Sequence, residues 1–128
     1  MPGELVIESL EKAGEVCADP APLIYARLFE LRPDYAALFE MDTDGGVRGS
    51  MLATCFEVIL GIIDGQPSQR VILSAARFSH GGYGVPEADI DVMFEAIRDT
   101  CRRLMGPAWS EAHEADWDAV MREIAAIA

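Results

Sequence analysis

The sequence predicts an all-α fold in a single domain, residues 1–128, and three observations predict it. Apolar residues recur at intervals of three and four along most of the chain, as on one face of an α-helix. Sustained apolar/polar alternation between hairpin turns, the signal of a strand, is missing. Hydrophobic residues make up 51% of the 128 positions, which argues against disorder and suits one domain with its own core.

The first two expected helices are separated by a proline-containing break. The first covers about residues 5–17 and ends at ADPAP. Asp19 is a suitable N-cap for the second helix and Pro20 a suitable first residue. That helix is expected to reach Leu31 and to stop before Pro33, because a residue preceding proline disfavours the helical conformation. RPDYAALFE then predicts a short turn of helix, and DTDGG a loop.

The longest apolar pattern covers residues 47–63 and predicts a buried helix that ends at DGQPS. A shorter helix follows and ends at His80, before a pair of glycines. The next is expected to open at Val85-Pro86 and to end at GPAWS, and the last to end near Ala128. About seven helices are expected in all.

The net charge limits the classes of partner that the protein is expected to bind, and the cysteines indicate its cellular compartment. The formal net charge is -12, from 22 acidic and 10 basic residues, so nucleic acid and anionic membranes are not expected as partners. No segment is expected to span a membrane, and the N-terminus lacks the features of a signal peptide. The cysteines are odd in number, far apart and without a CxxC, which predicts free thiols in a reducing cytoplasm: Cys17, Cys55 and Cys101.

His80, one of only two histidines, lies between a helical pattern and a glycine-rich corner. Two interpretations stay open: a histidine favoured by the helix dipole, or a metal ligand whose second ring nitrogen is held by Ser79 or a nearby carbonyl. One histidine cannot form a protein-only zinc site, but it can be an axial ligand to the iron of a porphyrin. Candidates to line an apolar slot for that group are Tyr25, Phe39, Val47, Met51, Val85, Ile90 and Met93.

Two motifs in this order resemble those of bacterial globins. YARLFELRPDYAALF, residues 25–39, matches the pattern YxRLFxxxPxxxxLF, and HGGYGV, residues 80–85, matches a proximal histidine followed by YGV. The chain is most similar to single-domain globins and to the haem domains of flavohaemoglobins, over about residues 5–127. The resemblance implies a globin fold that sandwiches one haem b.

The resemblance also implies roles for individual residues. His80 matches the proximal iron ligand, and Phe39 matches the aromatic residue that packs flat against the porphyrin. Tyr25 matches the distal tyrosine that donates a hydrogen bond to the bound gas. Val47 falls at the distal position usually filled by histidine or glutamine, and Met51 at the apolar position one turn later.

The sequence departs from the family pattern on both sides of the expected haem. Val47 cannot donate a hydrogen bond, so polar stabilisation of a ligand would depend on Tyr25. The glycines before Val47 can shift the register, which keeps Gly46 and Arg48 as alternatives. Ala76 stands where the family commonly has a bulky leucine, and the reductase module of flavohaemoglobins is absent.

Weaker expectations concern the rim of the site. Arg48, Arg77 and Tyr83 are loose candidates to meet the haem propionates, although a solvated side chain is the preferred interpretation of each. His113, among acidic residues at the start of the last helix, is expected to face solvent and not to bind iron.

The resulting hypothesis is a haem-binding globin that reversibly binds a diatomic gas, oxygen or nitric oxide, for binding, sensing or scavenging. A haem enzyme is an alternative, since Tyr25 suits nitric oxide dioxygenation if a separate reductase supplies electrons. A dedicated peroxidase is not expected because Val47 offers no distal base. The other alternative is a haem-free module with a globin fold and an interaction or regulatory role. The protein is expected to be a monomer or homodimer.

Overall fold

A computed structural model describes residues 2–128, and within them the chain forms helices and no strand. The prediction of an all-α fold is therefore confirmed. Six α-helices follow one another: α1 (Glu4–Val16), α2 (Ala21–Leu31), α3 (Gly46–Ile63), α4 (Pro67–His80), α5 (Ile90–Met105) and α6 (Glu111–Ala125). Short 3-10 segments lie in the connections: η1 (Pro33–Phe39), η2 (Gly81–Tyr83), η3 (Glu87–Asp89) and η4 (Gly106–Ala108).

Most boundaries fall where glycine and proline predicted them, with one clear exception. The helix expected to open at Val85-Pro86 begins only at Ile90. Pro86 has an extended ψ of 146°, and η3 then forms a 3-10 turn before the α-helix starts. Three-residue 3-10 turns are common at helix N-termini, and apolar spacing does not distinguish them from α-helix.

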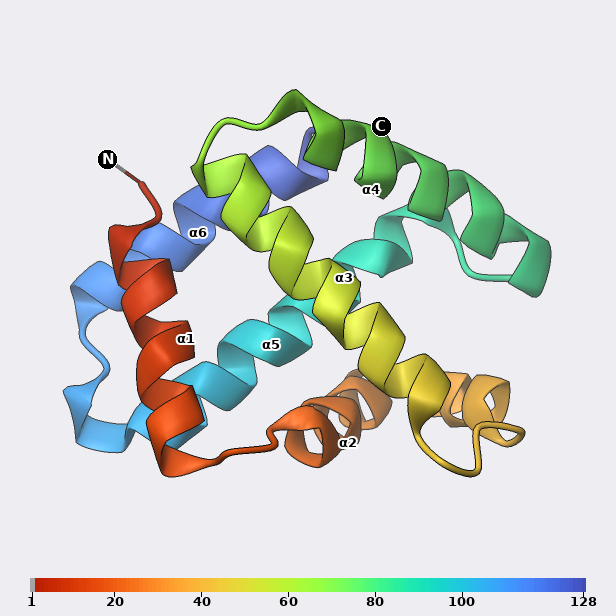
Figure 1. Ribbon diagram of the computed structural model, residues 1–128, viewed down its shortest axis with the longest axis horizontal. Helices are drawn as coiled ribbons and strands as arrows, with labels where there is room; N and C mark the ends of the chain where they lie inside the picture. Colours follow the sequence, from red (N-terminus) through yellow and green to blue (C-terminus); the bar gives the residue numbers. More distant parts are fainter. Residues whose placement is uncertain (1) are drawn as a thin grey trace.

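α5 is the central element of the fold. It packs against α1, α2 and α6, while α3 contacts α4, α6 and α2. α3 and α4 leave a shared corner and diverge from it, as Figure 1 shows. The candidate site residues on these two helices lie along the diverging arms.

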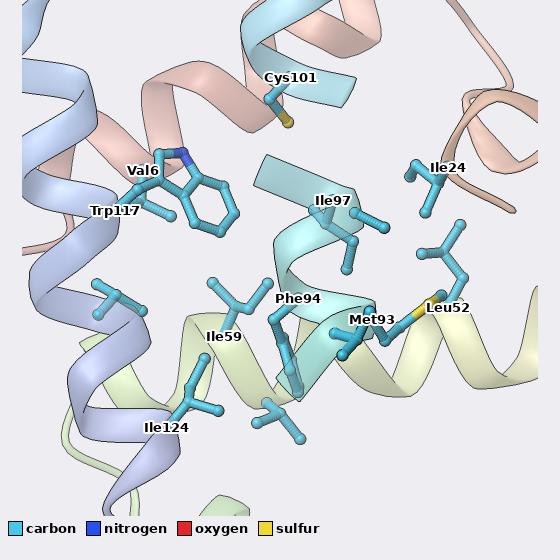
Figure 2. Packing of buried hydrophobic residues seen from close by; sticks show 14 of the residues in the cluster. Val6, Ile24, Leu52, Ile59, Met93, Phe94, Ile97, Cys101, Trp117 and Ile124 are labelled. Atoms are coloured by element: carbon cyan, nitrogen blue, oxygen red, sulfur yellow. The ribbon is translucent and has the colours of Figure 1, made fainter. Parts of the chain in front are cut away.

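The core is formed by apolar side chains from all six helices. Figure 2 shows Trp117 of α6, Phe94 of α5 and Ile59 of α3 in the same interior. Trp117 is fully buried, and its indole N–H donates to Ser9 Oγ at 2.9 Å. The Ser9 hydroxyl in turn donates to Val6 O at 2.7 Å. These two hydrogen bonds satisfy the indole N–H of Trp117 and the hydroxyl of Ser9, which would otherwise be costly to bury.

An acid from α6 caps the N-terminus of α1. Asp116 accepts hydrogen bonds from the backbone N–H groups of Gly3, Leu5 and Val6, at 2.7, 2.8 and 3.0 Å. A carboxylate at this point satisfies donors that the helix itself leaves free and interacts favourably with the helix dipole. The two ends of the chain are thereby joined.

The expectation that His113 faces solvent is wrong. The residue is 6% exposed and is the third residue of α6, where it forms a capping box with Ser110. Ser110 N donates to His113 Nδ1 at 3.1 Å, and His113 N donates to Ser110 Oγ at 3.3 Å. Its Nε2 lies 3.3 Å from Glu8 Oε1 of α1, and the Trp109 ring stacks on it. The sequence did contain a signal for this capping box. Ser110 lies three residues before His113, whose ring nitrogen can accept a hydrogen bond, and His113 stands where a capping box usually has glutamate.

α3 also departs from an expectation. By length and composition this helix could cross a membrane, with a mean hydropathy of 1.5, whereas no such segment was expected. The core helix of a globular protein passes the same test. A helix apolar on all sides is normally buried, yet only 28% of α3 is buried within the protein. Two large apolar side chains of α3, Val47 and Leu60, are left exposed.

Candidate functional site

His80 is the last residue of α4, and its side chain is bonded to its own helix. His80 Nδ1 lies 2.8 Å from Ala76 O. A carbonyl oxygen can only accept, so Nδ1 carries a proton, and in the neutral tautomer that this requires, Nε2 carries the lone pair. Nε2 has no hydrogen-bond partner among residues 2–128. A half-buried imidazole fixed in this way presents a nitrogen able to ligate a metal.

Arg77, one turn earlier on α4, is 3% exposed and anchors this part of the helix. Its Nη1 donates to Glu87 O at 2.7 Å, and its Nη2 donates to Asp91 Oδ1 at 2.6 Å and to Ile124 O at 2.8 Å. Arg77 is thus held by η3, α5 and α6 and does not fit the expected role at a haem propionate. The sequence offered no sign of this, because the three partners come from distant segments.

Tyr25 of α2 is buried, and its hydroxyl donates to Arg48 O at 2.8 Å. Burial raises the pKa of this hydroxyl well above its usual value, so it remains a neutral donor. The ring packs edge-on against Phe39 at a centroid distance of 5.3 Å and lies 6.1 Å from Phe29. This aromatic cluster joins α2 and η1 to the first turn of α3. The hydroxyl would have to leave Arg48 O to donate to a bound ligand with its single proton.

Asp42, expected only as part of a loop, organises the start of α3. Its carboxylate accepts from Val47 N at 3.0 Å and from Arg48 N at 2.9 Å. It also pairs with Arg48 Nε at 3.0 Å, so the Arg48 guanidinium is engaged here instead of at a haem edge. The hydrogen bond from Arg48 N is the main cause that lowers the pKa of Asp42, followed in the same direction by that from Val47 N. An aspartate shortly before an apolar helix is the usual capping signal.

The residues expected to line the haem fall into two groups in this structure. One group belongs to the hydrophobic core or packs against it: Tyr25, Phe39, Ile90 and Met93. The other group, with the expected ligand, lies outside that cluster: Val47, Met51, His80 and Val85. Val85 is buried at its own location, whereas Val47 is 55% exposed.

Apolar surface is left uncovered on both diverging helices. α3 exposes Val47 and Leu60, and α4 exposes Val71, Ile72 and Phe78, the last to 83%. A groove of about 650 Å³ runs between the outer side of α4 and the residues after α6, and one of about 300 Å³ lies between α2 and α5. Neither groove is lined by a residue expected to contact haem.

The side chains able to ligate a metal limit which metal-containing group the protein could bind. Within residues 2–128, no group of three or more His, Cys, Asp or Glu could hold a metal ion. A single histidine with a free Nε2 instead fits a metal whose other ligands come with it, as in a porphyrin. The exposed apolar side chains of α3 are of the kind that a porphyrin face contacts.

No family model matches the chain, and no curated protein or solved structure matches it either. What the structure shows about the fold is that it is all-helical within residues 2–128. The likeness to bacterial globins rests on the two sequence motifs, YARLFELRPDYAALF and HGGYGV.

Proposed function

We propose that this protein is a globin-like haem protein that reversibly binds a diatomic gas, with His80 as the axial ligand. The observation that carries the proposal is the 2.8 Å hydrogen bond between His80 Nδ1 and Ala76 O, which leaves Nε2 without a partner among residues 2–128 and, in the neutral imidazole, able to ligate a metal. The two globin-like motifs support it, because His80 belongs to one and Tyr25 and Phe39 to the other.

The apolar character of α3 gives a physical reason for the helix to take a porphyrin. Burying apolar surface is favourable by about 25 cal/mol per Å², and Val47 is largely exposed while Met51 is half-buried. Phe39 would pack on the ring, and His80 would hold the metal. When bound, the haem supplies an iron with an open position for the gas.

Tyr25 is the donor available to a gas ligand in this scheme. Its raised pKa keeps it protonated, and a hydrogen bond from it would contribute about 1–2 kcal/mol, roughly tenfold in affinity. The hydroxyl donates to Arg48 O, so a gas ligand would have to compete with that carbonyl. Oxygen and nitric oxide both suit such a donor, and turnover as a nitric oxide dioxygenase would need an external reductase.

A second candidate is a haem-free helical module that binds another protein. The packing of Tyr25 and Met93 within the core favours it, since both are at most 7% exposed. The exposed side chains of α3 and α4 would then be an interaction surface.

Titration of the purified protein with hemin, followed by reduction and exposure to carbon monoxide, tests the proposal. We expect a Soret band that saturates at one haem per chain and then shifts as for histidine-ligated ferrous-carbonyl haem. His80→Ala should weaken binding and change the spectrum. His113→Gln is the matched control, because glutamine preserves a capping box.

Two results would contradict the proposal. Absence of a saturable band would favour the haem-free module, for which a protein partner would then be sought. An unchanged spectrum and affinity in His80→Ala would show that another residue is the ligand.

A further inference from the structure

The groove between α2 and α5 is lined by no residue assigned to haem. The two helices pack against each other near the base of the view in Figure 1. The groove has a volume of about 300 Å³, at the small end of the range for ligand sites. It is lined by Leu23, Ala26, Arg27, Glu30, Asp99, Thr100, Arg102 and Arg103.

Asp99 is the centre of this arrangement. Its side chain is only 7% exposed and receives Arg27 Nε at 2.9 Å, Arg98 Nε at 3.1 Å and Arg102 Nη2 at 3.2 Å. Buried carboxylates are stable only when paired in this way. One acid thus fixes three guanidinium groups, and each retains N–H donors that Asp99 does not use.

Each arginine that lines the groove, Arg27, Arg102 and Arg103, has N–H donors that no acid within residues 2–128 engages. Arg27 meets Glu30 only through a long contact of 3.7 Å at Nη1, and its side chain is 37% exposed. Arg103 is exposed and forms no ion pair with the described part of the chain. Arg102 gives its Nη1 to Glu114 and is 43% exposed. Of the three arginines that line the groove, Arg27 and Arg102 are paired with acids, and Arg103 has no acid partner within residues 2–128.

The net charge of the residues that line the groove is opposite in sign to the net charge of the whole chain. The groove is lined by three arginines and two acids, whereas the whole chain has 22 acidic and 10 basic residues. Arg102 and Arg103 lie in the last turn of α5, where the helix dipole favours cations. That effect does not explain Arg27, which comes from α2 and faces the same groove.

We infer that this groove binds a small organic anion through a phosphate or carboxylate group. Paired guanidinium N–H groups match the oxygens of both anions, and arginines already oriented by Asp99 lose little side-chain entropy on binding. Leu23 and Ala26 provide an apolar wall for the body of the ligand. The small volume and the acidity of the rest of the surface exclude a long polyanion such as nucleic acid.

Calorimetry of the full chain at low ionic strength tests the inference, with inorganic phosphate and citrate as probes. We expect saturable binding of at least one probe, and the tighter probe identifies the source group as phosphate or carboxylate. Affinity should fall as salt rises, because the contacts are ionic. Arg103→Ala should weaken binding about tenfold, without a fold defect because its side chain is exposed and unpaired in residues 2–128.

Arg122→Ala is the matched control, since Arg122 is an exposed arginine on α6. Amide shifts on titration should centre on Thr100 and Arg103. The inference is overturned if neither probe saturates, if both variants lose affinity equally, or if the shifts map elsewhere. Binding here does not involve haem, so this test is independent of the hemin titration.

Discussion

The buried guanidinium of Arg77 lies one helical turn before the half-buried imidazole of His80, at the end of α4. The Arg77 side chain bonds to three other elements, whereas the His80 side chain bonds only to the carbonyl of Ala76 on its own helix. Arg77 therefore ties the end of α4 that carries His80 to η3, α5 and α6. Arg77 anchors the end of the helix, whereas Nε2 of His80 has no hydrogen-bond partner among residues 2–128.

Arg77→Met should lower the free energy of unfolding by about 3 kcal/mol, because it leaves Asp91 and two backbone carbonyls without their donor. Urea denaturation followed by circular dichroism measures the change. Arg70→Met is the control, since Arg70 is exposed on the same helix and should change stability by less than about 0.5 kcal/mol. Equal effects of the two substitutions would contradict the anchoring role.

Tyr25→Phe should destabilise the protein by about 1 kcal/mol through loss of the hydrogen bond to Arg48 O. If the protein carries haem, the same change should also raise the oxygen dissociation rate about tenfold. Stopped-flow kinetics and denaturation measure the two effects separately. Tyr83→Phe, at a residue that is 75% exposed, should change neither quantity. An unchanged dissociation rate in Tyr25→Phe would mean that the ligand receives no hydrogen bond from this hydroxyl.

Asp42 should make stability depend on pH in the acid range. Its pKa is lower in the folded state, so the stabilisation is complete above the unfolded-state pKa of about 3.9 and is lost as pH falls through the lower, folded-state value. Asp42→Asn should be less stable at pH 7, and its stability should change less between pH 5 and pH 2, as followed by urea denaturation. Asp44→Asn, at an exposed position in the same loop, should retain the wild-type profile. Parallel profiles for wild type and Asp42→Asn would rule out this origin of acid sensitivity.

The thiols should differ in reactivity. Burial raises the pKa of Cys55 and of Cys101 to about 12, so almost no thiolate of either is present at pH 8. Cys17 is half-buried near the end of α1. Ellman's reagent should therefore modify one thiol quickly in the native protein and all three in urea. Cys17→Ser should remove the fast phase, and persistence of that phase would mean that another cysteine is the accessible one.

The sequence by itself determined the all-α class, most helix boundaries and the place of His80 at a helix end. These features are local: apolar spacing within one helix, and the glycines and prolines that end it. Only the tertiary structure decided which polar residues are buried and what they bind. Arg77 meets Ile124 across 47 positions, and Asp116 caps Gly3 across 113. His113 is buried where Glu8 of α1 reaches it, and Asp99 is buried where Arg27 of α2 reaches it, for the same physical reason. A polar or charged side chain is buried only where another segment brings it a partner, and periodicity along the chain does not record those meetings.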